Sequence, residues 1–286
     1  MYEILTVEEL APVTKLFEVR APAVAHSAQA GQFVIIRVDE EGERIPLTIA
    51  DYDRERGIIT LVVQEVGKTS MRMGTLQPGD HLASFTGPLG KPTEIENYGT
   101  VLCVGGGVGI APVSPIARDL REAGNLVLSI IGARNKDLLF WEEKMRGVSD
   151  ELVVCTDDGS YGRKALVTIP MKEMLEAGRP IERIWAIGPA IMMKFCALTT
   201  QPFGVPTIVS LNSIMVDGTG MCGACRVEVG GQTRFVCVDG PEFDGHQVDW
   251  NQLLARQRIY LEQEKLALER WERECQRGAE QGDNDV

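Results

Sequence analysis

The sequence predicts an α/β plus all-β protein, in which an antiparallel β-barrel is followed by a doubly wound parallel sheet, a cysteine-containing loop and a helix. Three observations predict this class. Short β-rich runs separated by Gly, Pro and Asp extend to about residue 95, apolar runs alternate with helical segments from about residue 100, and three of the seven cysteines lie between residues 222 and 237. We place the domain boundaries so that the four regions are 1–97, 98–210, 211–245 and 246–286.

Composition narrows the function classes. At 286 residues, 44% hydrophobic and 24% charged, the chain is long enough to build two cores. A formal net charge of -12 argues against a nucleic-acid partner and against attraction to anionic lipid. No apolar run reaches about 18 residues, and the N-terminus MYEILTVEELAP lacks the basic and apolar regions of a signal peptide. We therefore expect a cytoplasmic protein without a membrane partner.

The first region reads as a barrel of short strands. The runs that predict strands are KLFEVRAP, QFVIIRVD, IPLTIADYD, GIITLVVQEV and DHLASFTGP. The sequence Gln77-Pro78-Gly79-Asp80 predicts a turn before the last run. The only helix we expect in this region covers about residues 70–76.

The second region reads as a parallel sheet covered on both faces. The runs TVLCVGGG, LVLSIIGAR, LVVCTDDG, RIWAIGP and PTIVSL are apolar without alternation, which is typical of strands buried on both sides. Helices are expected between them at about residues 111–123, 137–145, 169–176 and 190–199. Cys103 and Cys155 lie inside these runs, so we expect both to be small buried hydrophobes.

A glycine run predicts a dinucleotide site. The segment Gly105–Pro112 follows a strand and opens a helix, so its backbone can approach a pyrophosphate at the positive end of that helix. The ends of the other strands should lie at the same edge. Arg134 there suits an adenosine ribose, a 2′-phosphate or plain solvent, and the Asp157-Asp158 pair suits a turn as well as it suits a cofactor. The candidate residues are Gly106, Gly107, Val108, Gly109, Ala111, Pro112, Gly132, Ala133, Arg134, Asp157, Asp158, Gly188, Pro189 and Met192.

The spacing Asp217-x4-Cys222-x2-Cys225-x11-Cys237 is that of plant-type [2Fe-2S] ligation, with Asp in the first ligand position. Gly218, Gly220 and Gly223 lie between the ligands, where the backbone must turn and point N–H groups at sulfide. A zinc site is the alternative, because Cys222-x2-Cys225 alone is a common zinc pair. Asp at this spacing and the lack of a His favour the iron-sulfur interpretation.

Two segments of the first region resemble the flavin signatures of the ferredoxin reductase family. They are Arg44-Ile45-Pro46-Leu47-Thr48 and Gly67-Lys68-Thr69-Ser70. From composition alone they would be a strand and a helix cap. The resemblance implies FAD contacts at Arg44, Pro46, Leu47, Thr48, Val63, Gln64, Gly67, Thr69 and Ser70.

With GGGVGIAP, GAR, TDDGSYG, IGP and the cysteine loop, residues 1–245 resemble the electron-transfer subunits of type-B dihydroorotate dehydrogenase and their relatives. The similarity is most detailed to one branch, the small subunits of the NADH-dependent reduced ferredoxin:NADP oxidoreductases, also named sulfide dehydrogenase beta subunits. In the dihydroorotate dehydrogenase branch the first cluster ligand is Cys and the flavin signature begins Arg-Pro. Here those places hold Asp217 and Ile45-Pro46.

The resemblance implies hydride transfer between NAD(H) and FAD, followed by single-electron transfer to a [2Fe-2S] cluster. NADP(H) is the alternative nucleotide, and no protein residue is expected to act as a catalytic acid or base. The implied partner is a large subunit with a second flavin and [4Fe-4S] centres, which links this chain indirectly to ferredoxin and NADP(H) by electron bifurcation. The alternatives are a dihydroorotate dehydrogenase electron-transfer subunit and a non-catalytic, zinc-stapled nucleotide-binding module.

The C-terminal region predicts one charged helix over about residues 250–277. It either packs half-solvated on its own domain or docks on a partner subunit. We expect the tail GAEQGDNDV to be disordered.

Overall fold

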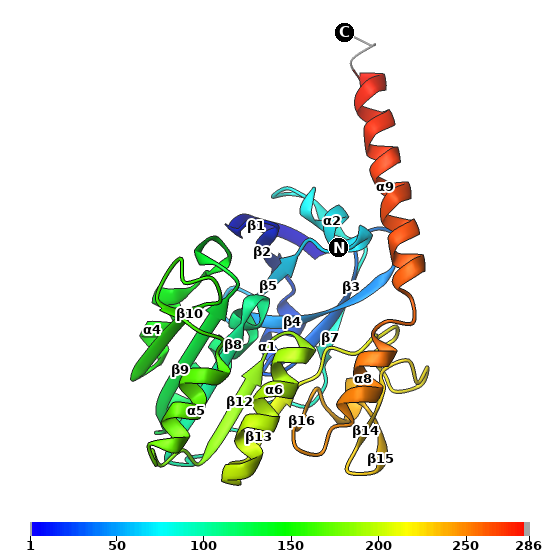
Figure 1. Ribbon diagram of the computed structural model, residues 1–286. Coiled ribbons are helices and arrows are strands. Elements are labelled where there is room, and N and C mark those ends of the chain that lie inside the picture. The colour runs from blue at the N-terminus through cyan, green and yellow to red at the C-terminus, as the bar shows by residue number, and fades with distance from the viewer. Residues whose placement is uncertain (1, 283–286) are drawn as a thin grey trace.

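The first region is an antiparallel barrel in the computed structural model, which describes residues 2–282 (Figure 1). The strands follow the order β6-β1-β2-β5-β4-β3-β7. They are β1 (Tyr2–Ala11), β2 (Thr14–Arg20), β3 (Phe33–Arg37), β4 (Arg44–Asp53), β5 (Ile58–Gln64), β6 (His81–Leu82) and β7 (Ser84–Leu89). One run of chain closes the barrel, because β6 pairs with β1 and the following β7 pairs with β3. The predicted barrel is confirmed.

Two details of the barrel differ from the expectation. The strand β1 was not among the predicted runs, and a helix α1 (Pro22–Ser27) occupies a region where no helix was expected. Pro22 at the first helical position explains how so short a helix begins, because proline is preorganised for that place. The expected helix near residue 70 is α2 (Lys68–Gly74), which begins and ends two residues earlier.

The second region is a seven-stranded sheet with the order β11-β10-β9-β8-β12-β13-β16. Its strands are β8 (Thr100–Gly106), β9 (Leu126–Ala133), β10 (Glu151–Thr156), β11 (Arg163–Lys164), β12 (Arg183–Ile187), β13 (Thr207–Ser210) and β16 (Glu242–Asp244). All neighbours are parallel except β16, which pairs antiparallel with β13 and arrives from beyond the cysteine loop. The predicted doubly wound sheet is confirmed, with one unpredicted antiparallel edge.

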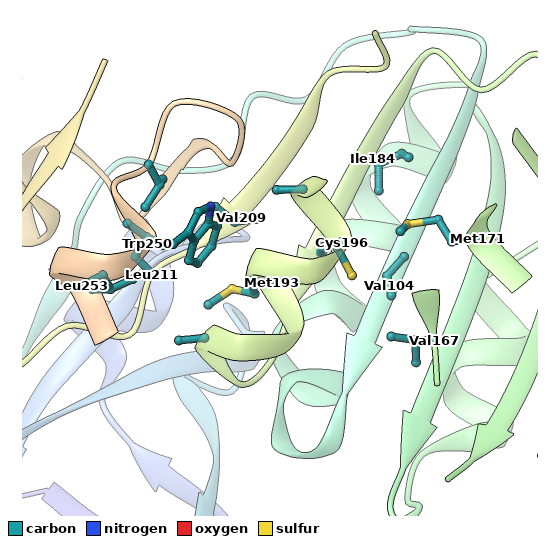
Figure 2. Close-up of a cluster of buried hydrophobic side chains, with 14 of the residues drawn as sticks. Val104, Val167, Met171, Ile184, Met193, Cys196, Val209, Leu211, Trp250 and Leu253 are labelled. Atoms are coloured by element: carbon teal, nitrogen blue, oxygen red, sulfur yellow. The ribbon is translucent and has the colours of Figure 1, made fainter. Parts of the chain in front are cut away.

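Helices cover both faces of this sheet. One core contains residues of α3 (Ile110–Glu122) and α4 (Glu142–Val148), and the core on the opposite face contains residues of α5 (Thr168–Glu176) and α6 (Ala190–Thr200). Figure 2 shows Met171 and Cys196 of that second core beside Val104 and Ile184 of the sheet. Cys103 and Cys155 are buried as predicted, with 0% and 1% of their surfaces exposed.

The prediction of one helix over residues 137–145 is wrong, because two shorter elements occupy this part of the chain. The chain instead forms a single 3₁₀ turn, η2 (Lys136–Leu138), and starts α4 at Glu142. Trp141 has a φ of 57°, in the left-handed region that a right-handed helix cannot contain. Its ring lies edge-on to the buried Phe140, so aromatic packing holds this strained turn.

The third region packs on both domains. It contains the hairpin β14 (Arg226–Val229) and β15 (Gln232–Phe235), then α7 (Val236–Asp239), and it is followed by α8 (Trp250–Arg256). Phe33 and Ile35 of β3 share a core with Cys225 and Val227, whereas the alternate residues of β3 face the barrel interior. The strand β3 therefore separates the barrel interior on one side from the cysteine loop on the other.

The predicted C-terminal helix is two helices. α8 ends at Arg256, and after a turn α9 (Leu261–Gly282) contacts α2 of the barrel and then projects away from the body (Figure 1). Trp250 and Leu253 anchor α8 beside Val209 and Leu211 (Figure 2), and the Gln257 side chain donates to the Asn212 carbonyl at 3.0 Å, which fixes the end of α8. Residues 278–282 of the tail expected to be disordered are helical, and residues 283–286 lie outside the described part. Within residues 2–282, no helix is long and apolar enough to cross a membrane.

Candidate functional site

The strand ends that carry the predicted dinucleotide residues meet at one edge of the second sheet. Gly106 of β8 is in register with Gly132 of β9, and Ala133 is in register with Thr156 of β10. On the other side of β8, Gly105 is in register with Ile187, which precedes Gly188. The register therefore places all four predicted strand ends side by side, where open α/β sheets bind ligands.

The glycine loop after β8 is shaped by its neighbours. A Cβ on Gly109 would lie 2.2 Å from the Ile187 carbonyl oxygen, and one on Gly106 would lie 2.1 Å from the Met192 sulfur. A Cβ on Gly188 would lie 2.8 Å from Cε of the same methionine. Gly107 differs, because it has a φ of +55° and a Cβ there would have no neighbouring atom within 4 Å. Gly109 is thus required by packing against backbone, Gly106 and Gly188 make room for the Met192 side chain, and the surface of Gly107 is open to a ligand.

The remaining predicted dinucleotide residues near this loop differ in exposure. Ala111 is 1% exposed in the core beneath α3, so its side chain cannot reach a ligand. Val108 and Pro112 are half-buried and Pro189 is exposed. The ligand-facing surface of the loop therefore consists mainly of backbone.

The turn after β10 lies beside the end of β9. The backbone N–H of Asp158 donates to the Arg134 carbonyl at 3.2 Å, and Oδ1 of Asp158 accepts bonds from the Ser160 N–H and hydroxyl at 2.9 and 2.7 Å. Burial and the adjacent Asp158 raise the pKa of Asp157, whereas Arg134 opposes that rise. Asp158 therefore stabilises the turn, which is one of the two roles that the sequence allowed. The charge of the exposed Arg134 acts on the neighbouring Asp157.

The first flavin-like segment is the first half of β4, whose side chains point alternately to the barrel interior and to the outside. Ile45 and Leu47 pack against the barrel core, so Arg44, Pro46 and Thr48 lie on the outer side. Leu47 can then reach a flavin on the outer side only through its backbone. The same holds for Val63 of β5, which is 2% exposed in the barrel core, whereas the following Gln64 is half-buried.

The second flavin-like segment is a preformed loop at the start of α2. The Ser70 hydroxyl accepts from the Val66 and Gly67 N–H groups, each at 3.0 Å, and donates to the Gly67 carbonyl at 2.9 Å. Thr69 donates to Glu43 at 3.1 Å beside a cavity of about 220 Å³. Within residues 2–282, the N–H groups of residues 68–70 have no hydrogen-bond partner, so they are available to an anion.

The predicted flavin and dinucleotide segments lie against each other. The strand β5 contacts η1 (Gly107–Gly109), the 3₁₀ turn of the glycine loop. Ala50 of β4 and Val62 of β5 are buried in the same core as α3. The two domains therefore share an apolar interface next to both segments.

The cysteine loop has the backbone that the cluster hypothesis needs. Gly218, Gly220 and Gly223 have φ angles of 77°, 82° and 66°, which only glycine adopts at little cost. The sulfurs of Cys225 and Cys237 are 3.3 Å apart, and Cys222 is exposed at the surface. The two buried sulfurs and this loop geometry fit a cluster bound at the surface.

Asp217 stabilises the same loop. Its Oδ1 accepts from the Thr219 N–H at 2.8 Å and its Oδ2 from the Cys222 N–H at 3.0 Å, and these bonds lower the pKa of the carboxyl. Each oxygen keeps a second lone pair that could reach iron. Within residues 2–282, no three His, Cys, Asp or Glu side chains lie close enough together to hold a metal ion.

The cysteine loop rests directly on the barrel. A Cβ on Gly218 would lie 2.7 Å from Cδ1 of both Ile35 and Leu89. Ile35 is in turn the cross-strand partner of Pro46 in the flavin-like segment. A single residue of β3 therefore separates that segment from the loop.

Sequence reasoning missed two polar junctions. Asp51 of β4 binds Arg118 of α3 and Lys144 of α4, and Thr93 donates to Glu242 of β16 at 2.7 Å. Burial raises the pKa of Glu242 to about 7. The partners in these bonds are 67 to 149 residues apart in the chain, so no local pattern could have revealed them.

Two families match the chain by sequence. An oxidoreductase FAD-binding domain matches residues 2–93, and the iron-sulfur cluster binding domain of dihydroorotate dehydrogenase B matches residues 212–249. A Thermotoga maritima protein named dihydroorotate dehydrogenase B (NAD(+)), electron transfer subunit homolog is 54% identical over 89% of this chain and 90% of its own length. The Desulforamulus reducens dihydroorotate dehydrogenase B electron transfer subunit is 33% identical over 87% of this chain and 97% of its own.

Solved structures of oxidoreductases are also similar to this chain. A chain of the NADH-dependent reduced ferredoxin-NADP oxidoreductase, reported for flavin-based electron bifurcation, is 51% identical, with a TM-score of 0.89 over 95% of this chain and 98% of that chain. Phthalate dioxygenase reductase, at 18% identity and a TM-score of 0.58 over 80% of this chain and 85% of that chain, shares the fold alone.

Proposed function

Because the chain belongs to the family of dihydroorotate dehydrogenase B electron-transfer subunits and their homologues, we propose that it transfers electrons between NAD(H), FAD and a [2Fe-2S] cluster. Its role is the NAD(H) arm of a flavin-based electron-bifurcating NADH/ferredoxin:NADP oxidoreductase. The observation that carries the proposal is the linear order of the three segments. The glycine loop lies on β5, the flavin-like strand β4 pairs with β3, and the cysteine loop rests on β3.

The protein's part in this transfer is to bind and orient. The open backbone at Gly107 and the helix behind it would hold the pyrophosphate of the nucleotide, and the free N–H groups of residues 68–70 would hold that of FAD. When bound, the flavin supplies the conversion between two-electron hydride chemistry and single-electron transfer to the cluster. Asp217, Cys222, Cys225 and Cys237 would hold the cluster.

NAD(H) rather than NADP(H) is the proposed nucleotide. Arg134 is the cation placed to meet a 2′-phosphate, but Asp157 lies within its electrostatic reach and Asp158 follows. The Asp157 carboxylate beside this guanidinium offsets its charge toward a phosphate dianion. A ribose 2′-hydroxyl suits this edge better.

The proposed partner is a large subunit that carries a second flavin and [4Fe-4S] centres and exchanges electrons with ferredoxin and NADP(H). The 51% identity to a chain of the ferredoxin-NADP oxidoreductase supports this partner. A second candidate is the electron-transfer subunit of a dihydroorotate dehydrogenase, because the relatives from Thermotoga maritima and Desulforamulus reducens carry that name. Copurification with a subunit that oxidises dihydroorotate would favour the second candidate.

The deciding experiment is an absorption and metal analysis of the purified protein, followed by titration with NADH and NADPH. We expect a yellow-brown protein with about two irons per chain, whose flavin is bleached by NADH at lower concentration than by NADPH. A colourless preparation containing one zinc would overturn the redox proposal. Bleaching by NADPH alone would overturn only the choice of nucleotide.

A further inference from the structure

The junction between the barrel and the nucleotide sheet contains a half-buried ionic contact. Oδ1 of Asp51 accepts a bond from Nη1 of Arg118 at 2.7 Å, and Oδ2 accepts one from Nζ of Lys144 at 2.6 Å. The side chain of Asp51 is 26% exposed, and those of Arg118 and Lys144 are 29% and 35% exposed. One carboxylate of the barrel thus joins two helices of the nucleotide domain.

A β-bulge aims Asp51 at these helices. Ile49 pairs with Leu61 and Asp51 with Thr60, so Ala50 is an extra residue in β4. Without it, alternation would turn Asp51 toward the barrel interior with Ile49. With it, Ala50 enters the core of the nucleotide domain and Asp51 reaches α3 and α4. The bulge therefore breaks the regular strand at the point that contacts the second domain.

The cations are themselves held in place. Arg118 donates through Nε to Asp119 at 3.0 Å, and its guanidinium lies 5.1 Å from the centre of the Tyr52 ring, whose hydroxyl donates to Asp119 at 3.3 Å. Nζ of Lys144 lies 3.8 Å over the ring of Trp141, the residue in the left-handed conformation. Both cations therefore face Asp51 with little rotational freedom.

We propose that Asp51 is a positioning residue that fixes the glycine loop of the nucleotide domain against the flavin-like strand, so that nicotinamide and flavin meet at reacting distance. This role rests on the proposed function. Asp51 follows Thr48 by three residues on β4, and Arg118 lies on the helix that the glycine loop opens. Both cofactor segments are thus joined to the ionic contact through continuous secondary structure.

The two cations keep the carboxyl group of Asp51 ionised. Although burial raises the pKa of Asp51, Lys144 and Arg118 lower it further than burial raises it, and the carboxyl stays ionised. An amide in its place would remove the negative charge by which the barrel holds Arg118 and Lys144, while Arg118 would keep only Asp119 of its own helix as an anion. The barrel and the nucleotide domain would then lose this ionic contact between them.

The test compares Asp51→Asn with Asp53→Asn, a matched control on the same strand whose ionic partner Arg56 lies 3.9 Å away at the surface. In rapid-mixing experiments with NADH we expect Asp51→Asn to slow flavin reduction at saturating NADH about tenfold, while the dissociation constant changes less than about threefold. The long-wavelength charge-transfer absorption of the nicotinamide–flavin pair should weaken in the same variant. Asp53→Asn should match the wild type in all three readouts.

A second readout uses the apoprotein, so that it does not depend on the proposed chemistry. Amide hydrogen exchange of β4 and α3 should accelerate in Asp51→Asn and in Lys144→Met, with exchange in the distant β14–β15 hairpin unchanged. Faster exchange with an unchanged reduction rate at saturation would reduce Asp51 to a structural role and overturn the inference. Absence of NADH-dependent flavin reduction in the wild type would instead overturn the proposed function, whatever the exchange result.

Discussion

The two glycine-rich loops of this protein achieve their shapes in different ways. In the dinucleotide loop, Gly109 is required because the backbone carbonyl oxygen of Ile187 would lie 2.2 Å from an added Cβ. In the cysteine loop, Gly218, Gly220 and Gly223 all have positive φ angles, and Gly218 is in addition packed against Ile35 and Leu89, each 2.7 Å from an added Cβ. The first loop depends mainly on packing against neighbouring backbone, and the second depends mainly on its own backbone conformation.

The difference follows from what supports each loop. The dinucleotide loop joins a central strand to a long helix, and parallel neighbours hold it on both sides. The cysteine loop has Ile35 and Leu89 beneath it and an exposed Cys222 above. We therefore expect the first loop to be rigid without ligand and the second to depend on the cluster.

The largest expected effect breaks the packed loop. Gly109→Ala would place a methyl group 2.2 Å from the Ile187 carbonyl, which forces β12 and α3 apart. We expect a loss of about 3 kcal/mol of unfolding free energy and no reduction by NADH, as measured by denaturant titration and flavin bleaching. Gly107→Ala is the control, since space is open there and only the φ of +55° opposes it, at about 1 kcal/mol. Equal losses in both variants would contradict a loop shaped by packing.

The second prediction concerns the loop that the cofactor completes. Cys225→Ser should abolish cluster binding, because a buried sulfur beside Cys237 is lost, while NADH still reduces the flavin. The unfolding free energy of the apoprotein should change by less than about 1 kcal/mol. Iron analysis and calorimetry on the apoprotein and holoprotein measure both quantities. A large loss of stability in the apoprotein would mean that the loop is preassembled like its counterpart.

A third prediction concerns the contribution of Glu242, in the strand β16 that follows the cysteine loop, to the free energy of unfolding at different pH values. The pKa of Glu242 is raised from 4.5 to about 7 by burial, so the folded state favours the protonated carboxyl. Its contribution is fully present below pH 4.5 and is lost as pH rises through 7, a decrease of about 3 kcal/mol. Glu242→Gln should remove this slope, whereas Glu94→Gln, with a side chain 69% exposed, should not. Parallel slopes for wild type and Glu242→Gln in denaturation between pH 5 and 8 would refute the assignment.

The smallest expected effect concerns the preference of the dinucleotide site for NADH over NADPH. Asp157→Asn would leave Arg134 without its opposing charge. We expect the preference for NADH over NADPH to fall about fivefold, because exposed charge interactions contribute up to about 1 kcal/mol. Dissociation constants for both nucleotides measure it, with Asp137→Asn on the neighbouring turn as the control. An unchanged ratio would mean that Arg134 does not face the ribose.

Much of the architecture could be predicted because it is local. Unalternated Val and Ile runs such as TVLCV indicate strands covered on both faces, and the glycine run marks the loop that follows them. Barrel closure, the β16 edge and the Asp51 and Glu242 contacts depend on residues far apart in the chain. The break at Trp141 was missed because neither Gly nor Pro marks a left-handed turn that aromatic packing stabilises.

The pairing of β13 with β16 has a topological consequence. Ser210 and Glu242 are cross-strand partners, and the Leu211 N–H donates to the Pro241 carbonyl at 2.9 Å. The cysteine loop is therefore an excursion between the two arms of one hairpin, and its ends are pinned at the sheet whether or not metal is bound. Because each doubling of loop length adds only about 0.6 kcal/mol to the entropy cost of this pairing, the length and sequence of the cysteine loop can vary while β13 and β16 stay paired.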